Sequence, residues 1–185
     1  MPDWSELIDN HGPLVWSTIR RLIGNRDDAS DCFQEVFSAA LELSRKQKVL
    51  SWTATLRHLA SVKAIDCLRR RYRDSQIQHS DYLAEIADSH SAPPQERLDS
   101  TELASALRAA LATIEPRQAQ IFSMICLDAM TYDEAAMAIG ITESHVGVLL
   151  NRARSALKQQ LHSYAPVTTN KSETGARFHA KRKQL

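Results

Sequence analysis

The chain has 185 residues, a length that suits one or two small domains. Hydrophobic residues make up 43% of it, which is enough for packed cores, and no apolar run approaches the length of a membrane span. The formal net charge is only +1, from 23 basic and 22 acidic residues, which excludes a uniformly basic nucleic-acid coat. With 5 Gly and 6 Pro against abundant Ala, Leu, Arg and Glu, the composition predicts an all-α fold.

Cysteine and histidine patterns give no sign of a metal site. Cys32, Cys67 and Cys126 lie far apart among apolar residues, so we interpret them as core residues of a protein in a reducing compartment. The N-terminus lacks a signal-peptide pattern, which predicts a cytoplasmic protein. No nucleophile elbow or phosphate loop occurs, so an enzyme is the least favoured class, and no catalytic residue, metal or cofactor is expected.

The first predicted domain covers residues 1–74. Residues 3 to 23 carry an apolar stripe that Gly12-Pro13 interrupts, so we expect a short helix followed by a longer one. Asp27 or Asp28 is expected to cap the next helix, which has one apolar face. The opposite face is polar and acidic and includes Asp28, Asp31, Gln34 and Glu35. It is either a solvated surface or a docking strip for a basic partner.

A third helix is expected to begin after its cap, Ser51, and to end in the run Arg69-Arg70-Arg71-Tyr72-Arg73. Cations favour a helix C-terminus electrostatically, but four arginines exceed that need. We therefore predict a phosphate-binding surface on this helix. Residues 75–94 are polar, contain Ala92-Pro93-Pro94 and are predicted to form a flexible linker.

The second predicted domain covers residues 95–164, and its last part has the pattern of a helix-turn-helix. Thr131 and Glu134 stand at capping-box spacing, Gly140 suits the end of a first helix, and Thr142 suits the start of a second. An ordinary helical hairpin has the same features, so this pattern alone leaves both interpretations open. The basic residues 165–185 lack periodicity and are predicted to be a disordered tail.

With both halves in view, the sequence resembles the sigma factors of bacterial RNA polymerase. Residues 14 to 43, with the run Arg26-Asp-Asp-Ala-Ser-Asp-Cys-Phe-Gln-Glu-Val-Phe37, and Ala64-Ile-Asp-Cys-Leu-Arg-Arg-Arg71 are similar to sigma region 2. The run Ile114-Glu-Pro-Arg-Gln-Ala-Gln-Ile-Phe122 and residues Thr131 to Arg154 are similar to region 4. Their order, without the intermediate regions, is that of the small extracytoplasmic-function (ECF) subfamily of the sigma-70 family.

The resemblance implies two joined helical domains and a set of partners. Region 2 is expected to bind the clamp helices in the largest subunit of the polymerase core through Asp28, Asp31, Gln34 and Glu35. The helix that follows is expected to hold the melted minus-ten element of promoter DNA through Arg57, His58, Ser61, Lys63, Arg69 and Arg70. Region 4 is expected to contact the flap of the second-largest subunit and to read the minus-thirty-five element through Glu143, Ser144, His145 and Val148, with Asn151, Arg152 and Arg154 on the DNA backbone. An anti-sigma factor between the two domains is a further expected partner, and membrane insertion is not expected.

The start of the predicted recognition helix departs from the family pattern. The run His145-Val-Gly-Val-Leu149 lacks two of the usual positive charges, and Gly147 costs a helix about 1 kcal/mol relative to Ala. We therefore expect weak or unusual recognition of the minus-thirty-five element. Two alternatives to a sigma factor stay open. One is a stand-alone helix-turn-helix regulator that binds duplex operator without polymerase, and the other is a sigma-like adaptor that binds proteins with weak DNA affinity.

Overall fold

The computed structural model describes residues 2–78 and 94–164, and all regular structure in these ranges is helical, which confirms the predicted all-α class. The elements in chain order are α1 (Trp4–Leu22), α2 (Arg26–Lys46), α3 (Trp52–Gln78), α4 (Pro94–Thr113), α5 (Pro116–Phe122), the π-helical turn η1 (Ser123–Leu127), α6 (Tyr132–Ile139), α7 (Glu143–Gln160) and the 3-10 turn η2 (His162–Tyr164). In this described part of the chain, no helix is both long and apolar enough to cross a membrane. The predicted tail lies outside the described residues, as does most of the predicted linker.

Helix α1 runs without a break through Gly12 and Pro13, so the predicted interruption is wrong. A proline inside a helix leaves one carbonyl four residues earlier, here that of Asp9, without an N–H partner. Asp9 and Pro13 are both exposed, so water can solvate that carbonyl. Gly12 is buried, and a Cβ built there would lie 3.6 Å from Cζ of Phe33 in α2. Gly12 therefore packs against α2 at ordinary van der Waals distance within a continuous α1.

Asn25 caps helix α2, so the prediction that Asp27 or Asp28 does so is wrong. The Asn25 side chain accepts hydrogen bonds from the backbone N–H groups of Asp27 at 2.7 Å and Asp28 at 3.3 Å. The two aspartates instead lie in the first turn, where carboxylates favour the positive end of the helix dipole. The predicted cap of α3 is confirmed, because the Ser51 hydroxyl accepts from the N–H of Ala54 at 3.3 Å.

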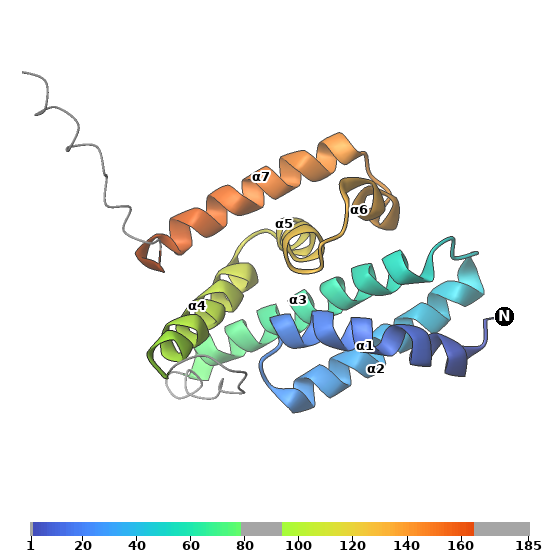
Figure 1. Cartoon of the computed structure of the whole chain (residues 1–185), viewed down its shortest axis with the longest axis horizontal. Coiled ribbons are helices and arrows are strands. Elements are labelled where there is room, and N and C mark those ends of the chain that lie inside the picture. The colour runs from blue at the N-terminus through green and yellow to red at the C-terminus, as the bar shows by residue number, and fades with distance from the viewer. Residues whose placement is uncertain (1, 79–93, 165–185) are drawn as a thin grey trace, which may run out of the picture.

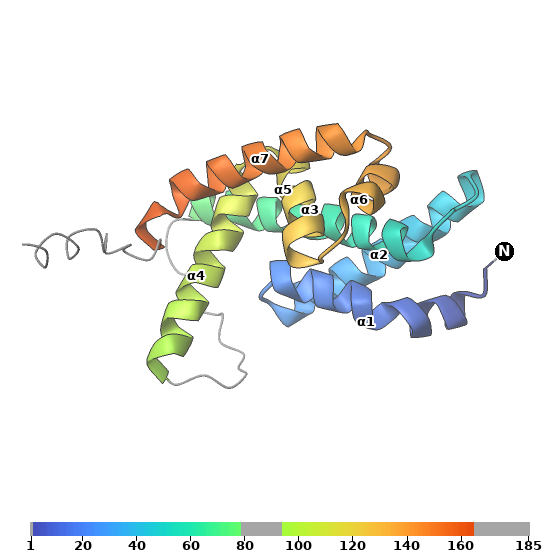
Figure 2. The same ribbon diagram turned by 45° about the horizontal axis from the view of Figure 1, so that its top comes forward.

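Helix α3 lies between the α1–α2 layer and the C-terminal helices (Figures 1 and 2). One buried apolar cluster includes side chains of α1, α2 and α3, for example Val15, Val36 and Ile65. The same cluster continues into the C-terminal half through residues such as Leu111 and Leu157. The two halves of the chain therefore share one core. Helix α3 also extends to Gln78, which lies inside the range predicted as linker.

The helix-turn-helix has a second apolar cluster of its own, built mainly from α5, η1, α6 and α7. Its local signals are those predicted from the sequence. The Thr131 hydroxyl accepts from the N–H of Glu134 at 3.2 Å, and the Glu134 carboxylate accepts from the N–H of Thr131 at 2.9 Å. Gly140 ends α6 with φ +75°, a left-handed conformation that glycine adopts without strain. Thr142 then caps α7.

Candidate functional site

The outer side of α2 carries an exposed polar surface, which we call the α2 acidic face. It consists of Asp31, Gln34, Glu35, Ser38 and Glu42, all of which are exposed. Together with Ala39 and Lys63 these residues line an open depression of about 460 Å³. The opposite side of α2 is buried in the shared core and holds the helix rigidly. The structure thus brings three of the four residues predicted to bind polymerase onto one solvent-facing surface.

Asp28 of α2 and Lys63 of α3 lie near this face, and each forms an ion pair across the contact between the two helices. Asp28 is half-buried and pairs with the guanidinium of Arg71. Lys63, which the family resemblance assigns to DNA, has its Nζ 3.4 Å from Oε2 of Glu35 and lines the depression of the α2 acidic face. Both pairs are partly exposed, so each contributes at most about 1 kcal/mol to stability. Lys63 therefore lies at the border between the two predicted surfaces.

Helix α7 presents a second exposed surface, the α7 outer stripe. Its members are all seven residues predicted to contact the minus-thirty-five element: Glu143, Ser144, His145, Val148, Asn151, Arg152 and Arg154. Val146, Leu149 and Leu150 face the opposite way and are buried in the helix-turn-helix cluster. Because the helical period places these sets on opposite sides, the outer stripe is available to a partner without any change in packing.

Tyr132, at the start of α6, is an addition to this surface that sequence reasoning missed. A Cβ built at Gly147 would lie 3.6 Å from Cε2 of Tyr132, so the ring packs beside the bare backbone of the recognition helix. Tyr132 stays 39% exposed and Val148 stays 46% exposed. Of the apolar run in α7, Val146 and Leu149 are buried and Val148 is exposed, so Val148 and Tyr132 are exposed apolar side chains near Gly147.

Cys126 is exposed, so its prediction as a core residue is wrong, whereas Cys32 is buried as predicted and Cys67 is half-buried. The Cys126 Sγ lies 3.7 Å from Nη2 of Arg154. Burial raises the pKa of the Cys32 thiol to about 12, which keeps it protonated. Among the described residues, no three His, Cys, Asp or Glu side chains are grouped so that they could hold a metal ion.

The six residues predicted to hold the minus-ten element do not share one open surface. Arg70 is exposed, and Lys63 pairs with Glu35 as described. Ser61 is fully buried, with its Oγ 3.4 Å from the Oγ of Ser123 in η1. The Arg69 guanidinium donates hydrogen bonds to backbone carbonyls at the end of α4. In this conformation, one side of α3 therefore contacts the C-terminal half instead of solvent.

Arg57 and His58 belong to the same covered side of α3. Both are half-buried, and the Nε of Arg57 and the Nδ1 of His58 are buried without a hydrogen-bond partner. Such groups lose their hydration without a replacement donor or acceptor, which costs free energy. Burial accordingly lowers the pKa of His58 below its usual value of 6.5. The Nε of Arg57 and the Nδ1 of His58 could form hydrogen bonds more easily if this side of α3 were open to solvent or to a ligand.

The lowered pKa of His58 predicts that the chain loses stability in mild acid. A proton binds more tightly to the unfolded chain than to the folded one, so the free energy of unfolding is at its full value above about pH 6.5 and falls as the pH drops below that value. Urea unfolding at about pH 7.5 and about pH 5.5 measures this difference. We expect His58→Gln to reduce the loss, and an equal loss in both proteins would contradict the assignment to His58.

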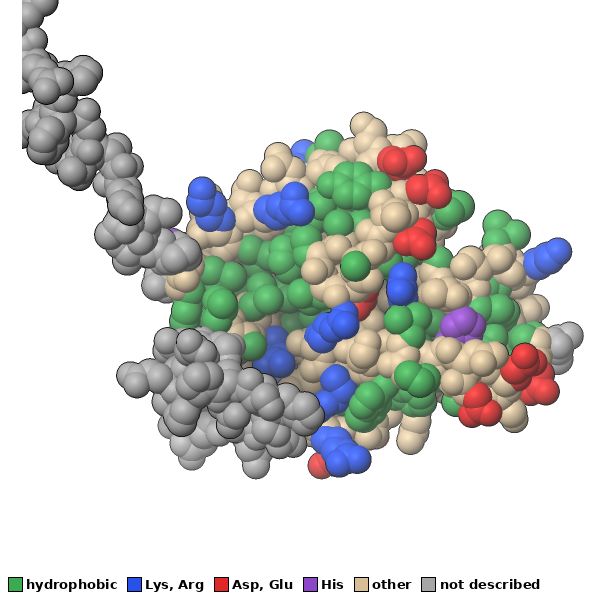
Figure 3. Space-filling model, in the orientation of Figure 1, with side chains coloured by type: hydrophobic (Ala, Val, Ile, Leu, Met, Phe, Trp, Pro, Cys, Tyr) green, Lys and Arg blue, Asp and Glu red, His purple; other side chains and the backbone are tan. Residues whose placement is uncertain are grey.

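Charge is distributed unevenly over the surface (Figure 3). On the face shown, acidic side chains gather over the α6 end and near the start of α1, while Lys and Arg side chains lie over the middle and along α7. A chain with a formal net charge of +1 thus presents separate surfaces of opposite sign. Separate surfaces suit two different partners, one basic and one acidic.

Comparison with known proteins identifies the family. The model described as Sigma-70 region 2 matches residues 7–74, and that described as Sigma-70, region 4 matches residues 104–157. The chain is 31% identical over 144 residues to "ECF RNA polymerase sigma factor SigF" of Caulobacter vibrioides, covering 77% of this chain and 76% of SigF. The chain belongs to the ECF sigma factors. This confirms the resemblance inferred from the sequence.

A second relative of this ECF sigma factor is longer. "ECF RNA polymerase sigma factor SigE" of Mycolicibacterium smegmatis is 25% identical over 169 residues, which cover 91% of this chain but only 65% of SigE. Two solved structures show the same fold. The sigma factor RpoE in complex with the anti-sigma factor NepR from Bartonella quintana has a TM-score of 0.54 at 20% identity over 88% of this chain and 98% of RpoE. CnrH in complex with the cytosolic domain of CnrY has a TM-score of 0.53 at 19% identity over 86% of this chain and 87% of CnrH.

Proposed function

We propose that this ECF sigma factor binds the core of RNA polymerase and directs it to promoters, where it helps to melt the DNA and start transcription. The observation that carries the proposal is the presence of two exposed surfaces of different character, the α2 acidic face in region 2 and the α7 outer stripe in region 4. The protein acts as a binding subunit in the cytoplasm, and the polymerase supplies the catalysis. Residues 1–74 form the region 2 unit and residues 95–164 the region 4 unit; because α3 extends to Gln78 and α4 begins at Pro94, the linker between them is confined to residues 79–93.

The α2 acidic face is the proposed contact for the clamp helices of the polymerase's largest subunit. Asp31 and Glu35 lie one helical turn apart and project from a helix whose other side is fixed in the core. Because the helix backbone is already fixed, pairing with a basic helical partner costs mainly the ordering of these side chains. Such complementarity fixes orientation and raises the association rate.

The α7 outer stripe is the proposed contact for the minus-thirty-five element. A helix in the major groove reads base edges with its first turns, and Val148 there can contact a thymine methyl group. Arg152 and Arg154 are placed further along the helix, where guanidinium groups bind phosphates. Arg70, together with the residues on the side of α3 that contacts the C-terminal half, is the proposed contact for the minus-ten element. The flap of the second-largest subunit is the proposed protein contact of region 4.

An anti-sigma factor is a further proposed partner. RpoE was solved in complex with the anti-sigma factor NepR, and CnrH in complex with the cytosolic domain of CnrY. The shared fold supports the same kind of control for this chain. Co-purification of the full chain from its own cells would identify such a protein.

Run-off transcription from genomic fragments with core polymerase tests the proposed function. We expect initiation at specific sites when the chain is added, and none with core polymerase alone. Arg70→Ala should retain core binding but lose most promoter opening, because Arg70 is exposed on α3 and no ion pair occupies it in the described residues. Lys158→Ala, which removes an exposed charge from the far end of α7, is the control for loss of charge alone.

The same assay separates the sigma factor from the two alternatives. A stand-alone regulator would bind a duplex site tightly without polymerase and would not support initiation. An adaptor would bind polymerase or another protein without producing any transcript. Either result would contradict the proposed function.

A further inference from the structure

The region 4 unit carries an excess of acidic residues, which is unusual for a module that binds DNA. Residues 95–164 hold 6 Lys and Arg side chains and 8 Asp and Glu side chains, a formal charge of −2. Modules that bind DNA are usually basic instead, because Lys and Arg neutralise phosphates and release their counterions. The unit therefore gains little of the non-specific attraction to DNA that this release provides.

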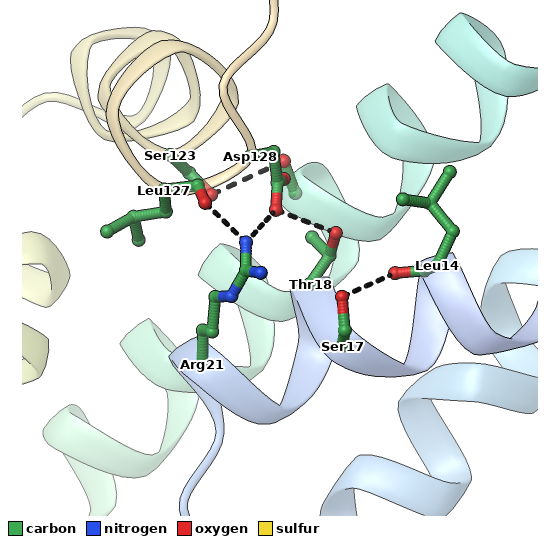
Figure 4. Close-up of polar contacts among 8 residues, drawn as sticks. Leu14, Ser17, Thr18, Arg21, Ser123, Leu127 and Asp128 are labelled. Carbon is green, nitrogen blue, oxygen red and sulfur yellow. Dashed lines mark hydrogen bonds and ion pairs between the residues drawn. The ribbon is translucent and has the colours of Figure 1, made fainter.

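One of these acidic groups does not face the solvent. The Asp128 side chain is only 2% exposed, and its Oδ1 accepts hydrogen bonds from Oγ1 of Thr18 at 2.9 Å and from Nη1 of Arg21 at 3.0 Å (Figure 4). Arg21 of α1 neutralises this carboxylate within the fold, so Asp128 does not repel a DNA backbone. The other acidic residues of the unit still outnumber its basic ones, by 7 to 6. The charge deficit therefore does not depend on Asp128.

Several of the acidic residues lie at the end of the unit that is proposed to read bases. Glu143 is in the first turn of α7, and Asp133 and Glu134 are in the first turn of α6. Glu143 and Asp133 are exposed, and Figure 3 shows acidic side chains gathered over the α6 end. The first Lys or Arg along α7 is Arg152, about two and a half turns after the helix begins. Positive charge on this helix therefore lies toward its C-terminal end.

The segment that follows this end of the unit has the opposite charge. Residues 165–185 lie outside the described residues, and their sequence holds five basic side chains and one acidic one, a formal charge of +4. The basic ones are Lys171, Arg177, Lys181, Arg182 and Lys183. Residues 1–164 together carry −3, so this segment alone makes the chain net positive. The positive charge expected of a DNA-binding protein is therefore concentrated in the 21 residues directly after η2.

The point from which this segment starts is fixed on the region 4 unit. Leu161, directly after α7, packs against the shared core, and η2 follows it. Helix α7 has 18 residues and is about 27 Å long. A chain of 21 residues spans at most about 70 Å. Its basic side chains are therefore able to reach phosphates beside a groove that holds the α7 outer stripe.

We propose that residues 165–185 form a cationic arm that binds the phosphate backbone of duplex DNA beside the minus-thirty-five element, and that this arm supplies the attraction that the recognition helix lacks. The inference rests on the proposed function of region 4. The α7 outer stripe selects bases, whereas the arm provides affinity without sequence preference. Binding through the arm depends strongly on salt, because each phosphate contact releases a counterion.

Two variants of the full chain test the arm. The neutral-arm variant combines Lys171→Gln, Arg177→Gln, Lys181→Gln, Arg182→Gln and Lys183→Gln. The matched control keeps every charge by exchanging the two cations at the same positions, with Lys171→Arg, Arg177→Lys, Lys181→Arg, Arg182→Lys and Lys183→Arg. The readout is fluorescence anisotropy with a labelled random-sequence duplex of about 30 base pairs, at salt concentrations from about 20 to 200 mM.

The expected result is a loss of both affinity and salt dependence. At about 100 mM salt, the neutral-arm variant should bind the duplex at least about 10-fold more weakly than the wild type. The slope of the logarithm of its binding constant against the logarithm of the salt concentration should be shallower by about 3 to 4. The charge-preserving control should bind like the wild type, because contacts to phosphates without sequence preference require charge and not one particular side chain.

A third variant tests whether the arm compensates for the recognition helix. Gly147→Lys in the neutral-arm protein adds a positive charge near the start of α7. A Cβ at this position would lie 3.6 Å from Cε2 of Tyr132, an ordinary contact, so the helix has room for the new side chain. We expect the affinity for the duplex to recover by about 3-fold or more, with a slope that is steeper again by about 1.

Several outcomes would overturn the arm. Equal affinities and equal salt slopes for the wild type and the neutral-arm variant would do so, as would a wild type that does not bind the duplex at about 20 mM salt. Tighter binding by the neutral-arm variant would show that the segment contacts acidic surfaces of its own chain instead. An equal loss of affinity in the charge-preserving control would exclude a role that depends on charge alone.

Run-off transcription keeps the arm and the proposed function apart. At about 50 mM salt, the neutral-arm variant should still initiate with core polymerase, and its initiation should fail at lower salt than that of the wild type as the concentration is raised. Absence of any transcript from the wild type would overturn the proposed function, whatever the duplex measurements show.

Discussion

Reversing two charges on the α2 acidic face, Asp31→Arg together with Glu35→Arg, should weaken binding to core polymerase by about 100-fold or more. Each substitution replaces an attraction to a basic helical partner with a repulsion at the same position. Stability should change little, because both residues are exposed and the ion pair of Glu35 with Lys63 is partly exposed. Competition against a labelled wild-type chain for core polymerase measures the affinity.

A matched control separates the local effect from that of net charge. Asp9→Arg with Glu102→Arg changes the net charge by the same amount at exposed positions on α1 and α4, away from the α2 acidic face. This control should retain most of the affinity, with only a modest change in association rate that salt removes. If both double variants lost affinity equally, the surface on α2 would not be the polymerase contact.

Leu150→Ala should destabilise the chain by about 2 to 5 kcal/mol, a loss that leaves little of the stability of an ordinary small domain. Leu150 is 1% exposed and lies in the cluster that holds α5, η1, α6 and α7 together. Removing its branched end leaves a cavity that the surrounding helices fill only in part. Binding to promoter duplex should be lost along with the fold. Chemical denaturation followed by circular dichroism measures the change in the free energy of unfolding.

Val148→Ala is the matched control for Leu150→Ala, because it truncates an aliphatic side chain two positions away on the same helix. Val148 is 46% exposed on the α7 outer stripe, so its truncation should change stability by no more than about 0.5 kcal/mol. Its effect should appear in duplex binding, where the contact with a base edge is reduced. Equal destabilisation by both variants would contradict the assignment of the two faces of α7. Unchanged duplex binding with Val148→Ala would remove this residue from the reading surface.

The helix-turn-helix was predictable because its signals are local. The capping box of Thr131 and Glu134, the left-handed Gly140 and the cap at Thr142 all depend on residues within four positions of each other. Periodicity alone also separated the buried and exposed sides of α2. Predictions from local signals were wrong for the cap of α2 and for the continuity of α1. Asn25 caps α2 in place of the predicted aspartates, and α1 continues through Gly12 and Pro13, with Gly12 buried against α2.

The environment of α3 was beyond sequence reasoning for a physical reason. This helix is buried along two sides, since Leu56 and Ile65 join the shared core while Ser61 contacts η1. A polar residue such as Ser61 looks solvent-facing in a sequence, and its partner lies 62 positions away. Thr18 did carry a usable signal, because a polar residue inside the apolar stripe of α1 requires a buried partner. Nothing in the sequence identified Asp128 as that partner.

The double role of helix α7 has a consequence for how its specificity can evolve. Ala153 and Leu157 join the core shared by both halves, while Val146 and Leu150 join the cluster of the helix-turn-helix. Substitutions at these buried positions destabilise the fold, because they disturb the packing of both clusters. We therefore expect new promoter preferences to arise along the α7 outer stripe. Variants of this lineage with altered regulons should differ there while the inward positions keep their volume.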